Sequence, residues 1–229
     1  MEGVGGVNLF SLSPVYSEST VSGHHIQSAT IPLRYAHVFS GGRQALLIDM
    51  PVSRYQYDQS VGYEAQLGIA LKNKVTDHWS LTPQVAVGGE GSVDMGSISM
   101  VYSGFLKSDV VYPYNHWFFH LDNMAGYLQT QNINIDEYAM DYGLKNWAFE
   151  SGGGVGYSWV HYMMDIGFSH TKIAGNVGWY YDNYNTAILS LARTKTIKGV
   201  KYRQLAVDAS YVFTRDNYKL VQLGLAYHF

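Results

Sequence analysis

The last twelve residues of the chain, 218–229, alternate between two kinds of side chain. Val221, Leu223, Leu225, Tyr227 and Phe229 fall on one face, and the residues between them are small or polar. A period of two predicts a β-strand with one apolar face and one polar face. Such a strand needs a different environment on each side, and this requirement constrains the whole fold.

Similar alternating segments recur along the chain, separated by turn signals. The predicted strands are 7–18, 26–39, 43–55, 62–74, 78–90, 96–110, 116–130, 150–160, 162–173, 185–197, 201–213 and 218–229. Most are long enough for transmembrane strands, which need about 9–11 residues. The sequence therefore predicts an all-β chain with one domain over 1–229, an antiparallel up-and-down barrel of about twelve strands with a polar lumen. Ten strands with longer hairpins stay possible, because segment 131–160 is ambiguous.

The composition agrees with a barrel in a membrane. Only 14% of residues are charged and 15% are aromatic, whereas soluble domains carry about 25% charged residues. The mean hydropathy is only −0.11, and no apolar run is long enough for a transmembrane helix. A closed amphipathic sheet satisfies both observations. The absence of Cys suits an oxidising periplasm, and a net charge of −3 without a basic cluster argues against nucleic acid as a partner.

The link lengths predict an orientation. If Phe229 lies at the periplasmic end, the short links 40–42, 75–78, 111–116, 159–162 and 197–201 are periplasmic. The longer links 19–25, 56–61, 91–95, 131–149 and 174–184 then face outward, as in bacterial barrels. Both termini are expected in the periplasm. Residues 1–6 are interpreted as an expression start joined to a mature sequence.

The inward positions are where a pore would act. Assigned by alternation, the charged pore-lining candidates are Arg34, Asp49, Glu64, Lys72, Glu90, Lys107, Asp122, Asp165 and Asp208. Carboxylates outnumber bases, which favours a hydrated pore with weak cation preference; a salt-bridged lumen that only supports the wall is the alternative. The predicted membrane-interface aromatics are Trp79, Trp117, Tyr227 and Phe229.

Other motifs indicate structure rather than chemistry. The glycines of 152–156 lack the Lys and Ser/Thr of a phosphate loop, so we expect them to make room for a neighbouring ring. His170 and Lys172 are expected at the lipid headgroups, and the basic stretch 193–203 is expected in a solvated turn. Neither His24-His25 nor Asp136-Glu137 has the spacing of a metal or acid–base site, so no catalytic residue, metal or cofactor is predicted. Loops 131–149 and 174–184 either extend their hairpins or bind a partner or sugar.

A strand that closes on Phe229 resembles the C-terminal signature of Gram-negative outer-membrane barrels. Twelve strands and the ending Gly224-Leu225-Ala226-Tyr227-His228-Phe229 look more specifically like the translocator domain of autotransporters, in its solitary form. The resemblance implies a non-enzymatic, monomeric outer-membrane barrel with a narrow pore, outer-membrane lipids and lipopolysaccharide as surroundings, and the barrel assembly machinery as a partner of the last strand. Residues 1–6 are too short and Gly-rich for the pore-spanning helix of that family, so a barrel without a passenger is expected.

Three other functions remain open. Narrow porins for acidic oligosaccharides carry two basic tracks in the lumen, and this predicted lumen is not basic. A structural or surface-interaction barrel would have a closed lumen and use its outer loops. A lipid A-modifying hydrolase would need a His-x-Ser pair, but Lys172 stands two residues after His170, and the nucleophile is missing.

Overall fold

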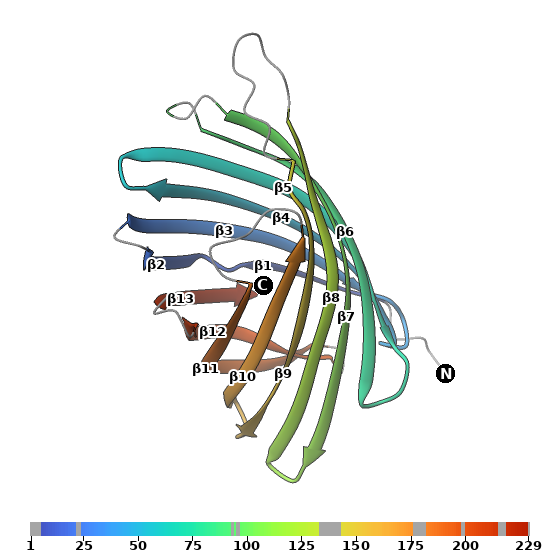
Figure 1. The fold of residues 1–229 in the computed structure, drawn as a ribbon. Helices are drawn as coiled ribbons and strands as arrows, with labels where there is room; N and C mark the ends of the chain where they lie inside the picture. Colours follow the sequence, from blue (N-terminus) through green and yellow to red (C-terminus); the bar gives the residue numbers. More distant parts are fainter. Residues whose placement is uncertain are drawn as a thin grey trace.

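The computed structural model describes residues 6–21, 24–92, 94, 97–132, 143–175, 182–197, 200–214 and 219–228. All the regular structure in these residues is antiparallel β-sheet (Figure 1). The strands are β1 (Val7–Leu12), β2 (Val15–Val21), β3 (His24–Val38), β4 (Gln44–Tyr57), β5 (Ser60–Lys74), β6 (Trp79–Ser92), β7 (Ser97–Tyr114), β8 (Trp117–Asn132), β9 (Lys145–Ser158), β10 (Tyr162–Gly175), β11 (Asn183–Ile197), β12 (Val200–Phe213) and β13 (Lys219–His228). From β2 to β13 each strand pairs with the next one in the chain, which confirms the predicted up-and-down order, and β1 pairs with β3 and β13.

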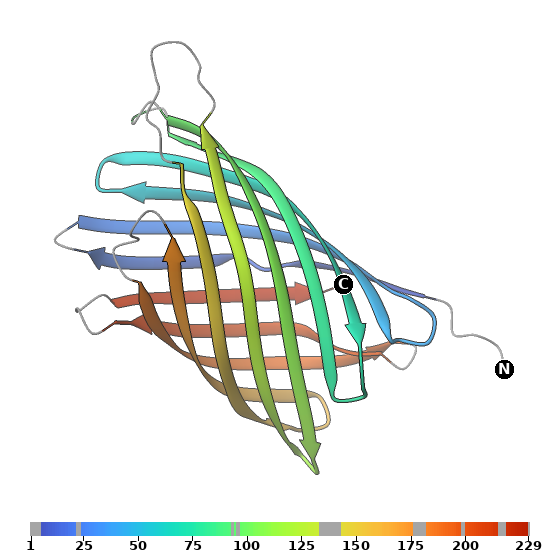
Figure 2. The ribbon, with the colours of Figure 1, turned by 45° about the vertical axis from the view of Figure 1, so that its right-hand side comes forward.

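The sheet closes on itself between its first and last strands. β13 pairs with β2, as in Gly224 opposite Val15, and its end pairs with β1, where His228 lies opposite Ser11. Figure 2 shows β13 beside β1 and β2, which completes the wall. Closure leaves no open sheet edge among the described strands. A lipid environment requires this, because it offers no partners for unpaired backbone N–H and C=O groups.

The predicted first strand, 7–18, is interrupted. β1 and β2 are separated at Ser13 and Pro14, because proline has no backbone N–H to donate to the ladder. Pairing nevertheless continues across the break. Ser13 N donates to Pro32 O at 3.2 Å, and Leu225 N donates to Pro14 O at 2.9 Å. β1 and β2 therefore act as one wall strand, and the barrel has the predicted twelve strands.

Several strands run further than predicted. β7 extends to Tyr114, β8 ends at Asn132 and β9 begins at Lys145, which decides for twelve strands over ten. The links expected to be long at 19–25 and 56–61 are reduced to residues 22–23 and 58–59. The predicted strands ended where polar residues interrupt the alternation of apolar and polar side chains. Backbone pairing between the strands continues beyond that point, as where Gln56 lies opposite Gln27.

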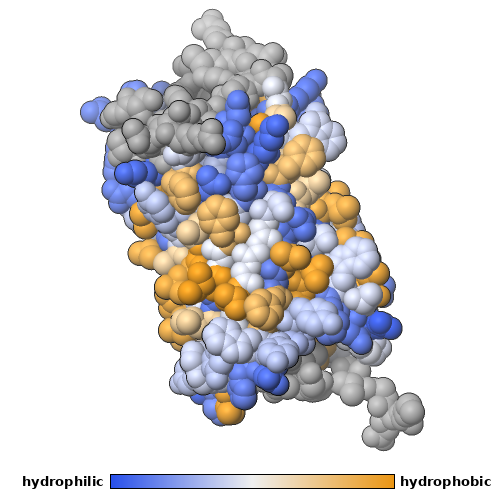
Figure 3. All heavy atoms as spheres, turned by 60° about the horizontal axis from the view of Figure 1, so that its bottom comes forward, coloured by the Kyte–Doolittle hydropathy of each residue, from blue (hydrophilic) through white to orange (hydrophobic). Residues whose placement is uncertain are grey.

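The barrel is apolar outside and polar inside. On β13, Val221, Leu223 and Leu225 are 51%, 56% and 47% exposed on the outer wall, whereas Gln222 and Gly224 face the interior. Figure 3 shows hydrophobic residues gathered in a band across one face, between more hydrophilic ends. Water would penalise so large an apolar surface, while lipid would not. In the described part of the chain, no helix is long and apolar enough to cross a membrane.

Candidate functional site in the barrel lumen

The strand register places every charged pore-lining candidate on the inner wall. Directly opposed residues of neighbouring strands face the same side, so one inward residue assigns its partners. Glu64 lies opposite Glu90, and Asp165 lies opposite Ser190, which in turn lies opposite Asp208. The alternation of exposed apolar residues between them gives the same assignment for the rest of the set. The inward residues are Arg34, Asp49, Glu64, Lys72, Glu90, Lys107, Asp122, Asp165 and Asp208.

Two ion pairs connect neighbouring parts of the inner wall. Arg34 Nε donates to the carboxylate of Asp49, its register partner, and the Asp49 side chain is only 11% exposed. Lys72 Nζ lies 3.4 Å from Asp109 Oδ2, a contact that passes over β6 from β5 to β7. Ser80 Oγ also donates to Asp109, at 3.3 Å. These pairs compensate part of the lumen charge.

A histidine on β8 lies between two carboxylates, one on its own strand and one on β10. His120 Nδ1 contacts Asp122 on its own strand, and His120 Nε2 lies 3.1 Å from Asp165 Oδ1 on β10. The imidazole thus joins β8 to β10 across the intervening strand β9.

Glycines on β9 make this reach possible. Gly154 is the register partner of His120, and a Cβ at Gly154 would lie 2.4 Å from His120 Nε2. Gly156 lies under the ring of Phe118 in the same way, where a Cβ would be 1.9 Å from the ring. The glycine-rich segment therefore accommodates rings, the role predicted for it, and is part of a strand rather than a phosphate loop.

The polar wall continues onto β11 and β12. Ser190 Oγ donates to Asp208, and Arg203 Nη1 donates to Ser190 Oγ at 3.2 Å. Ser190 thus connects a carboxylate and a guanidinium on the neighbouring strand. Because Asp165 lies opposite Ser190, this group adjoins the His120 cluster on the inner wall.

One carboxylate pair has no cationic partner. Glu64 and Glu90 are opposed on β5 and β6, and neither forms an ion pair with a base among the described residues. Gln66 Nε2 donates to Glu64, which supplies a neutral partner only. Like charges directly opposite each other repel, so these two side chains contribute uncompensated negative potential near the end of the barrel opposite the C-terminus.

Further charged or titratable groups of the inner wall were not among the predicted residues. They include Asp109, His120, Glu150, Arg203 and His228. Asp109 shares the alternation of Lys107, so parity alone could have found it. Glu150 stood at the edge of a predicted strand, and Arg203 lies beside a register shift between Arg193 and Thr194 that alternation does not reveal.

Aromatic side chains surround the outer wall at the end that holds the C-terminus. Trp79, Trp117 and Tyr227 are 36%, 48% and 46% exposed there, while Phe229 lies outside the described residues. Trp79 Nε1 donates to Ser108 Oγ at 3.0 Å, and Trp117 packs edge-to-face on Tyr157 with 4.9 Å between ring centroids. Amphipathic rings at this level suit the boundary between lipid and water.

The opposite rim holds a histidine–carboxylate contact. His24 Nδ1 lies 2.6 Å from Asp58 Oδ2, and the backbone N–H of His25 donates to Asp58 Oδ1 at 2.9 Å. These two hydrogen bonds hold the pKa of Asp58 below its usual value, and the hydrogen bond with His24 has the larger effect. Asp58 has a positive φ of 50° in the link from β4 to β5, so the contacts fix an unusual turn conformation.

The remaining residues singled out from the sequence do not form a catalytic or binding site among the described residues. His170 and Lys172 point outward on β10, where His170 Nδ1 lies 3.0 Å from Asn185 Oδ1. Thr171 lies on the opposite, inner face and is 2% exposed. Asp136 and Glu137 lie outside the described residues.

No protein-family model and no curated protein matches the sequence. Solved structures match its fold. The β domain of the Bordetella autotransporter BrkA superimposes with a TM-score of 0.71 at 9% identity, over 97% of this chain and 98% of that one. The fold is that of an outer-membrane β-barrel. An outer-membrane channel from Pseudomonas putida F1 gives a TM-score of 0.61 at 13% identity, over 98% and 96% of the chains. The translocator domain of the autotransporter NalP from Neisseria meningitidis gives 0.60 at 11%, over 100% and 90%.

Proposed function

We propose that this chain forms a narrow water-filled pore across the bacterial outer membrane, which passes small solutes with a mild preference for cations and catalyses no reaction. The supporting observation is the accessibility of charged side chains on the inner wall. The side chains of Arg34, Asp122 and Lys72 are 49%, 45% and 42% exposed although they face the interior. Charges of this kind are tolerated in a barrel when water fills the lumen.

The small size of many inward residues supports the same proposal. Gly167, Ser169 and Thr171 lie on the inner wall of β10, and they leave more room than the large apolar side chains that fill soluble barrels. The charge balance favours cations. The inward carboxylates outnumber the inward bases, and the Glu64–Glu90 pair has no base to neutralise it.

Single-channel conductance tests the proposal. The refolded chain is inserted into a planar bilayer, folding is verified by heat-modifiable electrophoretic mobility, and the reversal potential is measured in a KCl gradient. We expect stable steps with a cation-selective reversal potential. Verified folded protein that gives no steps would contradict the pore.

Two variants test whether the Glu64–Glu90 pair causes the cation selectivity. Glu64→Gln/Glu90→Gln removes the uncompensated lumen charge without changing side-chain size, so we expect the cation-to-anion permeability ratio to fall. Asp77→Asn makes a similar change at a carboxylate that is 92% exposed in the link from β5 to β6, outside the lumen. Its permeability ratio should match that of the unmodified chain.

Transport of a polypeptide, as in autotransporters, is the second candidate. The observation that favours it is the shared fold with the BrkA β domain over nearly the full length of both chains. To test it, a protease-sensitive reporter is joined ahead of residue 6 and secreted in a Gram-negative host. Reporter at the cell surface, dependent on the intact barrel, would support translocation; reporter retained in the periplasm beside a folded barrel would contradict it.

The pore proposal includes an orientation and surroundings. Both termini lie in the periplasm, the barrel is monomeric, and phospholipid and lipopolysaccharide surround its apolar wall. The barrel assembly machinery engages β13, whose alternation places Leu223, Leu225 and Tyr227 on the lipid side. Proteolysis of intact cells, which reaches outer loops only, tests the orientation.

A further inference from the structure

The wall carries a basic pocket on β11 and β12, near the end that holds the C-terminus. Val160, His161, Arg193, Thr194, Lys195 and Gln204 line it, with a volume of about 480 Å³. The lining contains two permanent cations and no carboxylate. One other described pocket is lined mainly by the apolar wall. A third, at the links from β3 to β4 and from β5 to β6, also contains two cations, Arg43 and Lys74. It differs from the basic pocket because Arg43 Nη2 has a carboxylate partner there, with Asp77 Oδ1 at 4.0 Å.

The cations of the basic pocket face the lipid side of the wall. Leu189 and Leu191 are 49% and 53% exposed outside the barrel, and alternation carries the same face to Arg193 and Lys195. Arg193 lies opposite Leu205, which is 41% exposed on the outer wall. These cations are therefore separate from the lumen charges. Part of the basic stretch that the sequence assigned to a solvated turn belongs instead to the wall.

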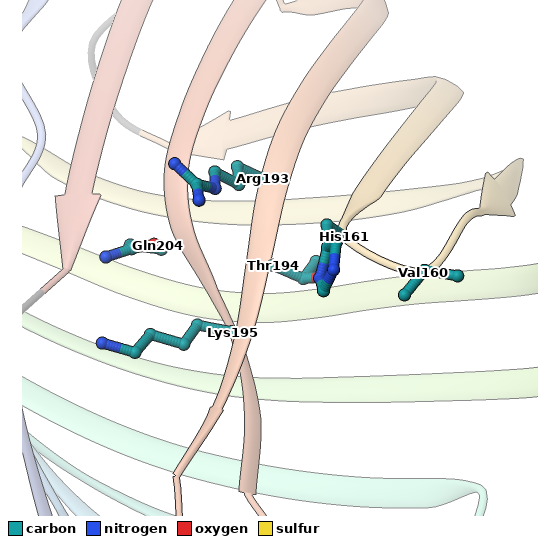
Figure 4. A pocket seen from close by; sticks show the side chains of 6 residues that line it. All are labelled: Val160, His161, Arg193, Thr194, Lys195 and Gln204. Carbon is teal, nitrogen blue, oxygen red and sulfur yellow. The ribbon is translucent and has the colours of Figure 1, made fainter.

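A β-bulge adds a third polar group. Arg193 pairs with Leu205 and Thr194 pairs with Arg203, so Gln204 is the extra residue of the ladder. A bulge re-aims a side chain that regular alternation would place elsewhere. In Figure 4, Arg193 and Lys195 extend from β11 in the same direction, and the Gln204 side chain lies between them in this view. Guanidinium, ammonium and amide donors thus share one side of the pocket.

The two cations lack a counter-ion in the protein. Neither Arg193 nor Lys195 forms an ion pair with a carboxylate in the part of the chain that the structure describes. A charge on the lipid face is costly in the hydrocarbon and is tolerated only at headgroup level, where an anion can neutralise it. A guanidinium donates a planar fork to phosphate oxygens, and an ammonium adds a point charge.

We infer that the basic pocket binds the phosphate of an anionic glycerophospholipid headgroup, with the acyl chains lying along the apolar outer wall. Arg193 and Lys195 bind the phosphate oxygens, and the Gln204 amide donates a further hydrogen bond. The apolar residues Leu189, Leu191 and Leu205 continue from the pocket toward the middle of the wall and contact the acyl chains. The inference depends on the barrel spanning a membrane but not on an open lumen, so conductance and lipid binding can fail independently.

Native mass spectrometry of the detergent-purified barrel tests this site. The probes are palmitoyl-oleoyl-phosphatidylglycerol, the diacylglycerol with the same chains, and inorganic phosphate. We expect retention of phosphatidylglycerol over diacylglycerol. In Arg193→Gln/Lys195→Gln, the retained phosphatidylglycerol should fall by about tenfold, because charge-assisted hydrogen bonds are lost.

The matched control removes the same charge at the other end of the outer wall. Arg54→Gln/Lys219→Gln changes two exposed, outward-facing cations there, and its lipid retention should equal that of the unmodified chain. Equal losses in both double variants would overturn the site in favour of non-specific charge attraction. Binding of inorganic phosphate without retention of phosphatidylglycerol would overturn the lipid as ligand. If the double variant fails to fold, Arg193→Lys, which keeps the charge but loses the planar fork, must lower retention to an intermediate level.

Discussion

Gly154 lies directly opposite His120 on neighbouring strands, and the imidazole occupies the space that a side chain at Gly154 would take. A Cβ at this position would also lie 2.3 Å from the carbonyl oxygen of Ile166. Gly154→Ala should therefore displace His120 from Asp165 and lower the unfolding free energy by about 1–3 kcal/mol, as overpacking does. Urea titration of the barrel in lipid vesicles measures the loss.

The neighbouring glycine provides the control for this prediction. Gly167 is the register partner of Gly154 on β10, but its Cβ would meet nothing closer than 3.6 Å. Gly167→Ala should change the unfolding free energy little. If both variants lose the same stability, general loss of glycine rather than the position of His120 is responsible.

Adjacent positions on β13 test which face meets lipid. Leu223 lies on the outer wall near the middle of the strand, and Gln222 faces the lumen. Leu223→Arg should cost about 2–4 kcal/mol of folding free energy in a bilayer, because the charge enters hydrocarbon. Gln222→Arg should cost much less, because the lumen of the proposed pore is filled with water. Equal costs in vesicle refolding would contradict the assigned faces.

The Arg34–Asp49 pair should stabilise the barrel by satisfying a buried carboxylate. Arg34→Met leaves Asp49, whose side chain is 11% exposed, without its cation, and we expect a loss of about 1–3 kcal/mol. Adding Asp49→Asn removes the unpaired charge and should recover part of that loss. A double variant less stable than Arg34→Met would show that Asp49 has another cationic partner.

The contacts of Asp58, at the rim opposite the C-terminus, predict an acid-dependent contribution to stability. The hydrogen bonds from His24 and His25 lower the pKa of Asp58 below its reference value of 3.8. A lowered pKa stabilises the folded state above that value, and the stabilisation disappears as the pH falls through the folded pKa. Asp58→Asn should flatten the stability curve below pH 3.8, as followed by urea unfolding at a series of pH values. Asp77→Asn, in an exposed link, should leave the curve unchanged.

Much of the architecture follows from local sequence. Alternation at β13 and β5 requires an apolar face and a polar face, and the number of alternating segments gave the number of wall strands. The inward direction of Glu64, Asp122 and Asp208 could also be predicted, because side chains along a strand point alternately to its two faces. Whether a position is odd or even within the strand, here called its parity, therefore decides the face. Parity could not reveal the break at Pro14 or the hairpins that continue beyond the apolar segments, since backbone hydrogen bonding rather than hydropathy determines them.

The sequence by itself determined the two faces of each strand, and with them the apolar wall and the polar lumen. Only the tertiary structure decided which inward residues meet. His120 and Asp165 are 45 residues apart, and their contact depends on the register of three strands and on the absence of a side chain at Gly154. The basic pocket depends likewise on a one-residue shift between β11 and β12. Parity is a local property of the chain, whereas register is a relation between strands that forms only when the sheet assembles.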